Sequence, residues 1–505
     1  MTQPAFDAFA AAHARGEPQL VWRRLVDDLE TPVSAFLKIG HGRPYAFLFE
    51  SVEGGAFRGR YSFVAMRPDR VWRCRGQAAE IAEGETDRFH PAPQPALASL
   101  RAFIDDARLP IPAELPPMAA GVFGALGYDT IRLAERLGEP NPDPLGLPDA
   151  VLIRPTIVAV FDSLKQEIVL VTPVRPDGSD AAAPYAAAEA RLAAVEAELA
   201  QPLPRRPTPP QVAQPPLASP VSRADYADIV EAAKRYIAAG DIFQVVPSHR
   251  FSAPFAQDPF AFYRALRRLN PSPYMYFLNF GGFQIAGSSP EILVRLRGGK
   301  VTIRPIAGTR PRGATPEADA QLERDLLADP KEIAEHQMLL DLGRNDVGRA
   351  VMLRDEGANA PAVPGRPRVR VTERFTVERY SHVMHIVSNV EGDAPDGLDP
   401  VDVILTALPA GTLSGAPKVR AMQIIDELES VKRGLTYAGC TGYISSTGEV
   451  DTAIILRTAL FKDGHMHVQS GGGVVADSDP DAEYEETLHK SAALRRAAEE
   501  AWRFD

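Results

Sequence analysis

Residues 274–287, YMYFLNFGGFQIAG, predict a β-hairpin, because two apolar runs flank the turn dipeptide Gly281-Gly282. Residues 293–303 and 459–469 have the same pattern and predict two more hairpins. Hairpins indicate antiparallel pairing, since parallel strands need long crossover connections. Helical patterns occur at residues 223–239, 260–269, 317–340, 399–408, 416–429 and 481–500. We therefore expect an α+β fold with large antiparallel β-sheets flanked by helices, and not a doubly wound nucleotide-binding fold.

A proline-rich segment divides the chain. Residues 201–221 contain eight prolines and follow a helix-forming stretch at 181–200. Such a segment forms neither a helix nor a central strand, so it predicts an extended linker. We expect an N-terminal domain over residues 1–200, a linker over 201–222 and a C-terminal domain over 223–505.

The composition excludes several classes of protein. The 505 residues carry a formal net charge of −11, which disfavours binding to nucleic acid or to an anionic membrane. The only cysteines, Cys74 and Cys440, provide no disulfide framework and no zinc–thiolate site. Neither a signal peptide nor an apolar run long enough to span a membrane is evident. We expect a cytoplasmic protein.

Residues 304–313, RPIAGTRPRG, place three arginines among glycines and prolines after a short apolar strand. Such a loop suits a small anion, because arginine forks match carboxylates and glycine lets the backbone approach a ligand. An ordinary basic turn before the helix that starts near Pro316 is the alternative.

Two predicted helices are acidic on one face. In the predicted helix 481–500, Glu483 and Glu486 lie three residues apart, and Lys490 follows Glu486 by four residues. Glu335 belongs to the predicted helix 317–340. Carboxylates from two helices would suit Mg²⁺, with a position left for a substrate carboxylate. A solvated, salt-bridged surface is the alternative, and spacing does not show that the helices meet.

Three further features are weak by themselves. The glycine-rich segments 468–474 and 409–418 suit either a ligand-contacting loop or a flexible bend. His385 lies in the apolar segment 380–386, where a buried structural histidine is the common explanation. These residues predict an anion site with a possible divalent cation, but no reaction.

Taken together, the motifs resemble the chorismate-utilising enzymes, and most closely their anthranilate synthase component I branch. The motifs occur in order as LFESVEGG (48–55), GRYSFVA (59–65), DIFQVV (241–246), NPSPYMYF (270–277), GSSPE (287–291), PIAGTRPRG (305–313), AEHQMLLDLGRND (334–346), RYSHVMH (379–385), PAGTLSGAPKVRAM (409–422), ILRTA (455–459) and GGGVVADSDPDAEYEET (471–487). The resemblance implies a two-domain α/β sandwich with a cleft for chorismate and Mg²⁺.

The resemblance also implies roles for residues of the cleft. Glu335 and Glu486 match the Mg²⁺ ligands, with Glu483 close by through water. Arg457 and Tyr437 match the residues that hold the enolpyruvyl carboxylate. The remaining substrate-binding set is Gly308, Thr309, Gly471, Gly472, Gly473 and Lys490.

Glu291 matches the proton donor to the departing 4-hydroxyl of chorismate, which needs one because hydroxide leaves poorly. Thr309 and His385 match residues beside the reacting ring, and for His385 proton transfer and positioning both stay open. The implied reaction adds ammonia at carbon 2, then eliminates pyruvate to give anthranilate, the first committed step of tryptophan biosynthesis.

Two positions bear on related reactions. Aminodeoxychorismate synthases carry a nucleophilic lysine where Ala307 stands. Isochorismate and salicylate synthases carry a lysine base where Gln244 stands. Both departures favour ammonia as the nucleophile. A catalytically silent tryptophan-binding partner is an alternative from another class, against which the intact acidic residues argue.

The resemblance implies feedback inhibition by L-tryptophan at a separate site, formed by Glu50, Ser51, Pro273, Tyr274 and Met275. Phe49 replaces the second leucine of the usual motif there. Ammonia is expected from a separate glutamine amidotransferase subunit (component II). Cys440 resembles a core substitution and not the nucleophile that such an amidotransferase needs.

Overall fold

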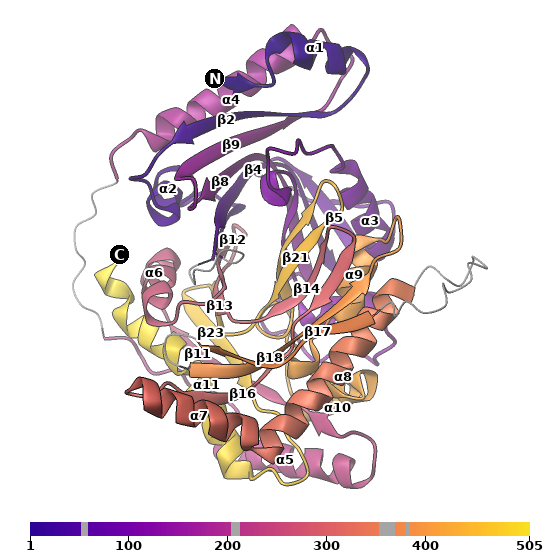
Figure 1. The fold of residues 1–505 in the computed structure, drawn as a ribbon, viewed down its shortest axis with the longest axis vertical. Helices are drawn as coiled ribbons and strands as arrows, with labels where there is room; N and C mark the ends of the chain where they lie inside the picture. The colour runs from indigo at the N-terminus through magenta and orange to yellow at the C-terminus, as the bar shows by residue number, and fades with distance from the viewer. Residues whose placement is uncertain (52–58, 204–212, 353–368, 380–382, 505) are drawn as a thin grey trace.

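A computed structural model describes residues 1–51, 59–203, 213–352, 369–379 and 383–504. Within these ranges, 21 strands join into one continuous sheet, and every pair of neighbouring strands is antiparallel. Helices lie on the outside of the strands, with α1 and α4 at one end and α5, α7 and α8 toward the other (Figure 1). The predicted α+β class with a large antiparallel sheet is confirmed.

The N-terminal part supplies nine strands and four α-helices among its described residues. In order they are β1 (Thr2–Gln3), α1 (Phe6–Ala14), β2 (Gln19–Val26), α2 (Pro32–Ile39), β3 (Ala46–Glu50), β4 (Tyr61–Arg75), β5 (Ala78–Glu83), β6 (His90–Pro91), α3 (Ala96–Asp106), the short helix η1 (Pro117–Ala119), β7 (Gly121–Leu126), η2 (Tyr128–Leu133), β8 (Ala150–Asp162), β9 (Glu167–Val174) and α4 (Ala182–Leu199).

The C-terminal part also consists of antiparallel strands and helices, with hairpins separated by helices. Its elements are α5 (Arg223–Ala238), β10 (Gln244–Val245), β11 (Ser248–Pro254), α6 (Pro259–Leu269), β12 (Tyr274–Asn279), β13 (Gln284–Ser289), β14 (Ile292–Arg297), β15 (Lys300–Ile303), β16 (Ile306–Pro311), α7 (Pro316–Ala328), α8 (Pro330–Met352), β17 (Val369–Arg379), β18 (Val383–Asp393), α9 (Pro400–Ala407), η3 (Gly411–Leu413), β19 (Gly415–Ala416), α10 (Lys418–Leu428), β20 (Cys440–Ser445), β21 (Val450–Ile454), β22 (Thr458–Lys462), β23 (His465–Gly471), α11 (Pro480–Glu500) and η4 (Ala501–Arg503).

Two arms of strands extend from the paired N-terminal strands β4 and β8. One arm runs β4–β3–β12–β13–β22–β23–β11. The other runs β8–β7–β20–β21–β14–β15–β18, and β16 and β17 both pair with β18. The chain crosses between the arms after β13 and again after β21. These crossings place segments that are distant in sequence beside one another.

The three predicted hairpins are confirmed as β12–β13, β14–β15 and β22–β23. The single helix predicted over 317–340 is wrong, because the structure has two helices that meet at Asp329-Pro330. Proline has no N–H to continue the first helix, but it suits the first position of the next. The Asp329 carboxylate accepts a hydrogen bond from the Lys331 N–H at 3.0 Å and caps that second helix.

The linker prediction is only partly visible. Residues 204–212 lie outside the described residues. Residues 213–217 have no regular structure, and Ala218 forms an isolated bridge with Ser252 of β11. Strands of the N-terminal and C-terminal parts pair directly, β3 with β12 and β7 with β20. The expected domain boundaries stay a prediction.

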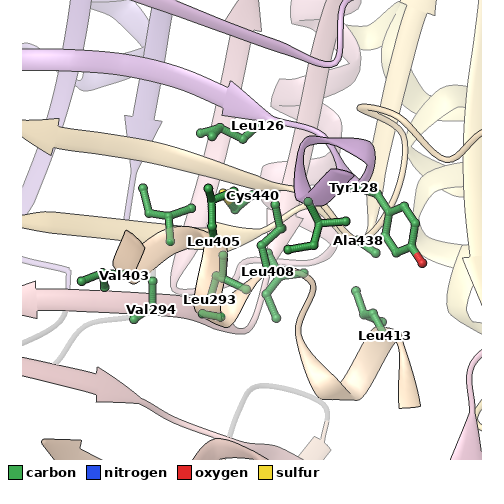
Figure 2. Close-up of a cluster of buried hydrophobic side chains, with 14 of the residues drawn as sticks. Leu126, Tyr128, Leu293, Val294, Val403, Leu405, Leu408, Leu413, Ala438 and Cys440 are labelled. Carbon is green, nitrogen blue, oxygen red and sulfur yellow. The ribbon is translucent and has the colours of Figure 1, made fainter. Parts of the chain in front are cut away.

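A large apolar core lies where the two parts meet. Figure 2 shows Leu126 of β7, Leu293 of β14 and Leu405 of α9 around Cys440. Cys440 is fully buried, and burial raises the pKa of its thiol to about 12. The predicted role of Cys440 as a core residue is confirmed. This core supports β14, the strand that follows Glu291.

Candidate functional site

Glu291 lies at the crossing from β13 to β14. Its side chain is buried, and burial raises the pKa of the carboxyl group to about 8. The Thr412 hydroxyl donates to the two carboxyl oxygens, over 3.2 Å to Oε1 and 3.3 Å to Oε2. At neutral pH Glu291 is therefore mostly a carboxylic acid, the form that can protonate a leaving group.

His385 of β18 stands opposite Thr309 of β16. Its Nδ1 lies 3.0 Å from Thr309 Oγ1 and 3.2 Å from the carbonyl oxygen of Gly308. Burial, reinforced by the positive charge of Arg457, lowers the pKa of His385 to about 4. The imidazole is therefore neutral at pH 7; when its Nδ1–H donates to Gly308, Nε2 keeps a lone pair.

Arg457 follows β21 with a φ of 48°, an uncommon conformation for a residue with a side chain and one that is frequent at functional sites. Its charge acts on Glu291, His385 and Lys490. Tyr437 is buried and interacts electrostatically with Lys490. The structure thus groups Arg457 and Tyr437, the two predicted carboxylate-binding residues, around the predicted acid and Lys490.

The glycines at residues 471–473 border the same space at the end of β23. Lys490 Nζ donates to the Gly471 carbonyl oxygen at 3.0 Å. A Cβ atom on Gly472 would lie 2.5 Å from Glu483 Oε2, and one on Gly473 would lie 2.5 Å from Gln244 Nε2. A larger residue there would displace the ends of these two side chains, so the main chain passes directly beside Glu483 and Gln244.

The three predicted metal ligands interact electrostatically through Glu486. Burial and the Glu332 and Glu486 carboxylates raise the pKa of Glu335 on α8. Burial and repulsion from Glu486 also raise the pKa of Glu483 on α11. Glu483 Oε2 is buried without a hydrogen-bond partner among the described residues, although Oε1 accepts from Ser478 at 2.7 Å. The Glu486 carboxylate thus acts on the pKa values of both Glu335 on α8 and Glu483 on α11, so the two acidic helices border the same space.

This carboxylate cluster fits a hard cation, because mutual repulsion and an unpartnered buried oxygen are both relieved by Mg²⁺. It is not preformed: within the described ranges, no three acidic, histidine or cysteine side chains are close enough to hold a metal. Glu486 is instead paired with Lys490 at 2.6 Å, and both side chains are nearly half exposed.

The segment 304–313 is not the loop that the sequence predicted. Residues 306–311 form strand β16, with a bulge between Ala307 and Thr309 where Gly308 has a φ of +76°. All three of its arginines form ion pairs: Arg304 with Glu373 and Glu378, Arg310 with Asp329 and Glu332, and Arg312 with Asp319. They fix the strand to its neighbours and do not serve as free anion anchors.

The five predicted effector residues lie apart from this cluster. Glu50, Ser51, Pro273, Tyr274 and Met275 all line one cavity of about 340 Å³. The cavity lies where β3 pairs with β12, and strands β14, β20 and β21 of the other arm also line it. The Glu50 carboxylate is already engaged there by Arg267 Nε, at 3.0 and 3.1 Å.

Sequence reasoning missed Thr412 as the partner of Glu291. The segment 409–418 was recognised as a glycine-rich bend, but nothing in it indicates which side chain reaches a glutamate 121 residues away. It also did not identify Arg295, which lines the cavity of the five predicted effector residues, called the effector cavity below. No helix in the described parts of the chain is both long and apolar enough to cross a membrane.

Comparison with known proteins assigns the chain to a family. A family model described as chorismate binding enzyme matches residues 59–496. Anthranilate synthase component 1 of Cereibacter sphaeroides is 54 % identical, over 99 % of this chain and 98 % of that protein. Anthranilate synthase component 1 of Pseudomonas putida is 49 % identical, over 93 % of each chain.

The crystal structure of anthranilate synthase component I from Streptococcus pneumoniae TIGR4 matches with a TM-score of 0.74 and 35 % identity, covering 94 % of this chain and 99 % of that one. The menaquinone-specific isochorismate synthase of Escherichia coli, at a TM-score of 0.68 and 19 % identity over 98 % of this chain and 99 % of that one, shares the fold alone. The chain belongs to the family of chorismate-binding enzymes.

Proposed function

We propose that this chain is component 1 of an anthranilate synthase and converts chorismate and ammonia into anthranilate and pyruvate. Identity of 54 % to such a protein over nearly the whole of both chains supports the reaction. The observation that carries the mechanism is Glu291, a buried carboxylic acid whose pKa is raised to about 8 and which shares its surroundings with Arg457. Few soluble sites keep a carboxyl group protonated at neutral pH without a task for that proton.

The cationic and main-chain groups orient the substrate. Arg457 and Tyr437 hold the enolpyruvyl carboxylate, aided by N–H groups of residues 471–473. Thr309 and Gly308 contact the ring from β16, whose position is fixed by its pairing with β18. Lys490 adds positive charge to the same space, opposite the acidic cluster.

Glu335 and Glu486 would hold Mg²⁺, with Glu483 nearby through water. When bound, the cation neutralises the ring carboxylate of chorismate and helps to orient it. To serve as a ligand, Glu486 would have to leave its ion pair with Lys490. The Lys490 ammonium would then be available to the substrate.

Ammonia then forms a bond to carbon 2 of chorismate as the two conjugated ring double bonds shift and the carbon 4–oxygen bond breaks, and the new ammonium group loses a proton to solvent. Glu291 gives its proton to the departing hydroxyl, which leaves as water, and the product is an aminodeoxyisochorismate. In the second step the carbon 2 proton and the enolpyruvyl group are lost as pyruvate forms, and the ring becomes aromatic. His385, neutral at pH 7 and opposite Thr309 in the sheet, would assist this proton transfer.

Two positions argue against related reactions. Ala307, beside the bulge of β16, offers no amine to capture carbon 2. Gln244, packed against Gly473, has no basicity near pH 7 with which to activate water. An aminodeoxychorismate or isochorismate synthase is therefore the weaker candidate.

Ammonia comes from a glutamine amidotransferase partner, because this chain offers no suitable nucleophile. Both of its cysteines lie among the described residues, are buried, and have a pKa raised by burial to about 12. L-Tryptophan acts as an inhibitor in the cavity lined by Ser51 and Met275. Its aromatic walls suit an indole ring.

The test is the fluorescence of anthranilate formed from chorismate, Mg²⁺ and an ammonium salt. The wild-type protein should form anthranilate without a partner, and glutamine should not replace ammonium. Glu291→Gln should reduce the rate by ~10²–10⁴-fold, because general acid catalysis typically contributes that much. Glu317→Gln, an exposed change on α7, is the matched control. Absence of anthranilate with the wild-type protein, or full activity of the Glu291 variant, would contradict the proposal.

A further inference from the structure

The effector cavity, lined by Ser51, Tyr274 and Met275 among others, has aromatic walls and more arginines than acidic residues. Six aromatic residues line it: Phe49, Tyr61, Phe63, Tyr274, Tyr276 and Tyr443. Its volume of about 340 Å³ is at the lower end of the range for small-molecule sites. The lining suits a flat apolar ring, but an amino acid also carries a carboxylate that must be paired when it leaves water.

Three arginines line this cavity, and two of them are already paired. Arg60 binds Asp162 through Nε at 2.9 Å and Nη2 at 2.6 Å. Arg297 Nη2 donates to Asp451 at 3.0 Å and to the Tyr443 hydroxyl at 2.7 Å. Both arginines therefore have fixed carboxylate partners, although Arg297 Nε is buried without a hydrogen-bond partner among the described residues.

Arg295 is different. It lies two residues before Arg297 on β14, so the two side chains share one face of the strand. Asp451 is its direct cross-strand neighbour, but that carboxylate is paired with Arg297. Within the described residues, the Arg295 side chain forms no hydrogen bond and no ion pair, although it is only partly exposed.

The carboxylates of the cavity do not supply the missing partner. Glu50 accepts hydrogen bonds from Arg267 and Tyr263 of α6, and Asp451 is held by Arg297. Arg295 is thus a positively charged residue in the wall of an aromatic cavity, without a carboxylate partner among the described residues. Its planar fork of donors matches a carboxylate in a bidentate arrangement.

We propose that Arg295 binds the carboxylate of the aromatic amino acid that occupies this cavity and thereby selects an amino acid over its amine or amide analogues. The inference rests on the proposed inhibitory site for L-tryptophan and adds the residue that recognises the charged end of the ligand. Arg60 and Arg297 keep their structural pairs when the ligand binds.

The experiment measures binding of L-tryptophan and L-tryptophanamide by calorimetry to the full-length chain. Arg295→Met keeps most of the apolar stem but removes the guanidinium. It should weaken tryptophan binding by about 10- to 100-fold, as expected for loss of a charge-assisted hydrogen-bonded pair. Tryptophanamide has no carboxylate, so its affinity should change by no more than about threefold.

Arg295→Lys keeps the charge without the fork and should give an intermediate loss for tryptophan alone. The matched control is Arg235→Met on α5. Arg235 is exposed and does not line the effector cavity. It should bind both ligands like the wild-type protein. Thermal unfolding of each variant shows whether it is folded.

Equal loss of both ligands in Arg295→Met would overturn the inference, because it would indicate a damaged cavity and not a lost carboxylate partner. Unchanged tryptophan affinity in that variant would overturn it as well. A wild-type protein that forms anthranilate but binds no tryptophan would refute the inhibitory site itself, and Arg295 with it. A wild-type protein that binds tryptophan but forms no anthranilate would instead refute the proposed reaction and leave the result for Arg295 standing.

Discussion

Replacing Thr412 by valine should raise the pKa of Glu291 further. The hydroxyl donates to the carboxyl oxygens over 3.2 and 3.3 Å, and this donation favours the charged carboxylate. These distances are long for an O–H···O hydrogen bond, so we assign the contact about 1 kcal/mol. That energy corresponds to a change of ~0.7 in pKa. Thr412→Val should therefore move the pKa of Glu291 from about 8 to roughly 8.7.

The direction of the effect on catalysis follows from the role of Glu291 as an acid. Its protonated form is active, so kcat/KM is retained below its pKa and falls as the pH rises through it. The assay is kcat/KM for anthranilate formation between pH 6 and pH 10, with total ammonium adjusted to hold free ammonia constant. In Thr412→Val the alkaline limb should shift upward by about 0.7 pH units.

Two controls separate this electrostatic effect from packing damage. Thr412→Ser keeps the hydroxyl and should leave the limb in place. Thr406→Val removes another largely buried hydroxyl, one that donates to the Asp402 carbonyl oxygen, and should also leave it in place. An unchanged or downward-shifted limb in Thr412→Val would refute the assignment of Glu291 as the acid that is tuned by Thr412.

Three other variants test the site. Glu291→Gln should stabilise the fold at pH 9 by about 5 kcal/mol relative to wild type, measured by urea unfolding. A folded-state pKa near 8 makes the stability of the wild type fall as pH rises from about 4.5 to 8, and equal stability of the wild type at pH 5 and pH 9 would contradict this. Glu335→Gln should weaken Mg²⁺ binding by at least ~10-fold in calorimetry, while Glu317→Gln should not; unaltered Mg²⁺ affinity would remove Glu335 from the metal site. Ala307→Lys should slow anthranilate formation by ~10- to 100-fold, and an unaffected rate would show that this side chain does not face the ring.

The local features of the fold could be predicted from the sequence. The hairpin at residues 274–287 and the last helix, expected over 481–500 and found over Pro480–Glu500, depend on neighbouring residues. The break at Pro330 was missed because apolar residues occur at helical spacing both before and after this proline, so the two helices resemble one. The bulge at Gly308 was missed because only pairing with β18, whose sequence is about 75 residues away, makes that segment a strand.

The site was predictable only where a motif carried the information. The resemblance named Glu291, His385 and Arg457, but nothing in the sequence indicates that Thr412 reaches Glu291 from another element. Three arginines line the effector cavity. The sequence alone does not show which of them lacks a partner, because the partner of Arg60 is 102 residues away and that of Arg297 is 154 residues away. Long-range ion pairs thus decide which charges remain for a ligand.

Isotope tracing tests the central claim most directly. Wild-type protein is incubated with chorismate, Mg²⁺ and ¹⁵N-ammonium, and the products are identified by mass spectrometry. The proposed reaction predicts ¹⁵N-anthranilate and pyruvate in equal amounts. An amino product that retains the enolpyruvyl group, or isochorismate without nitrogen, would contradict it.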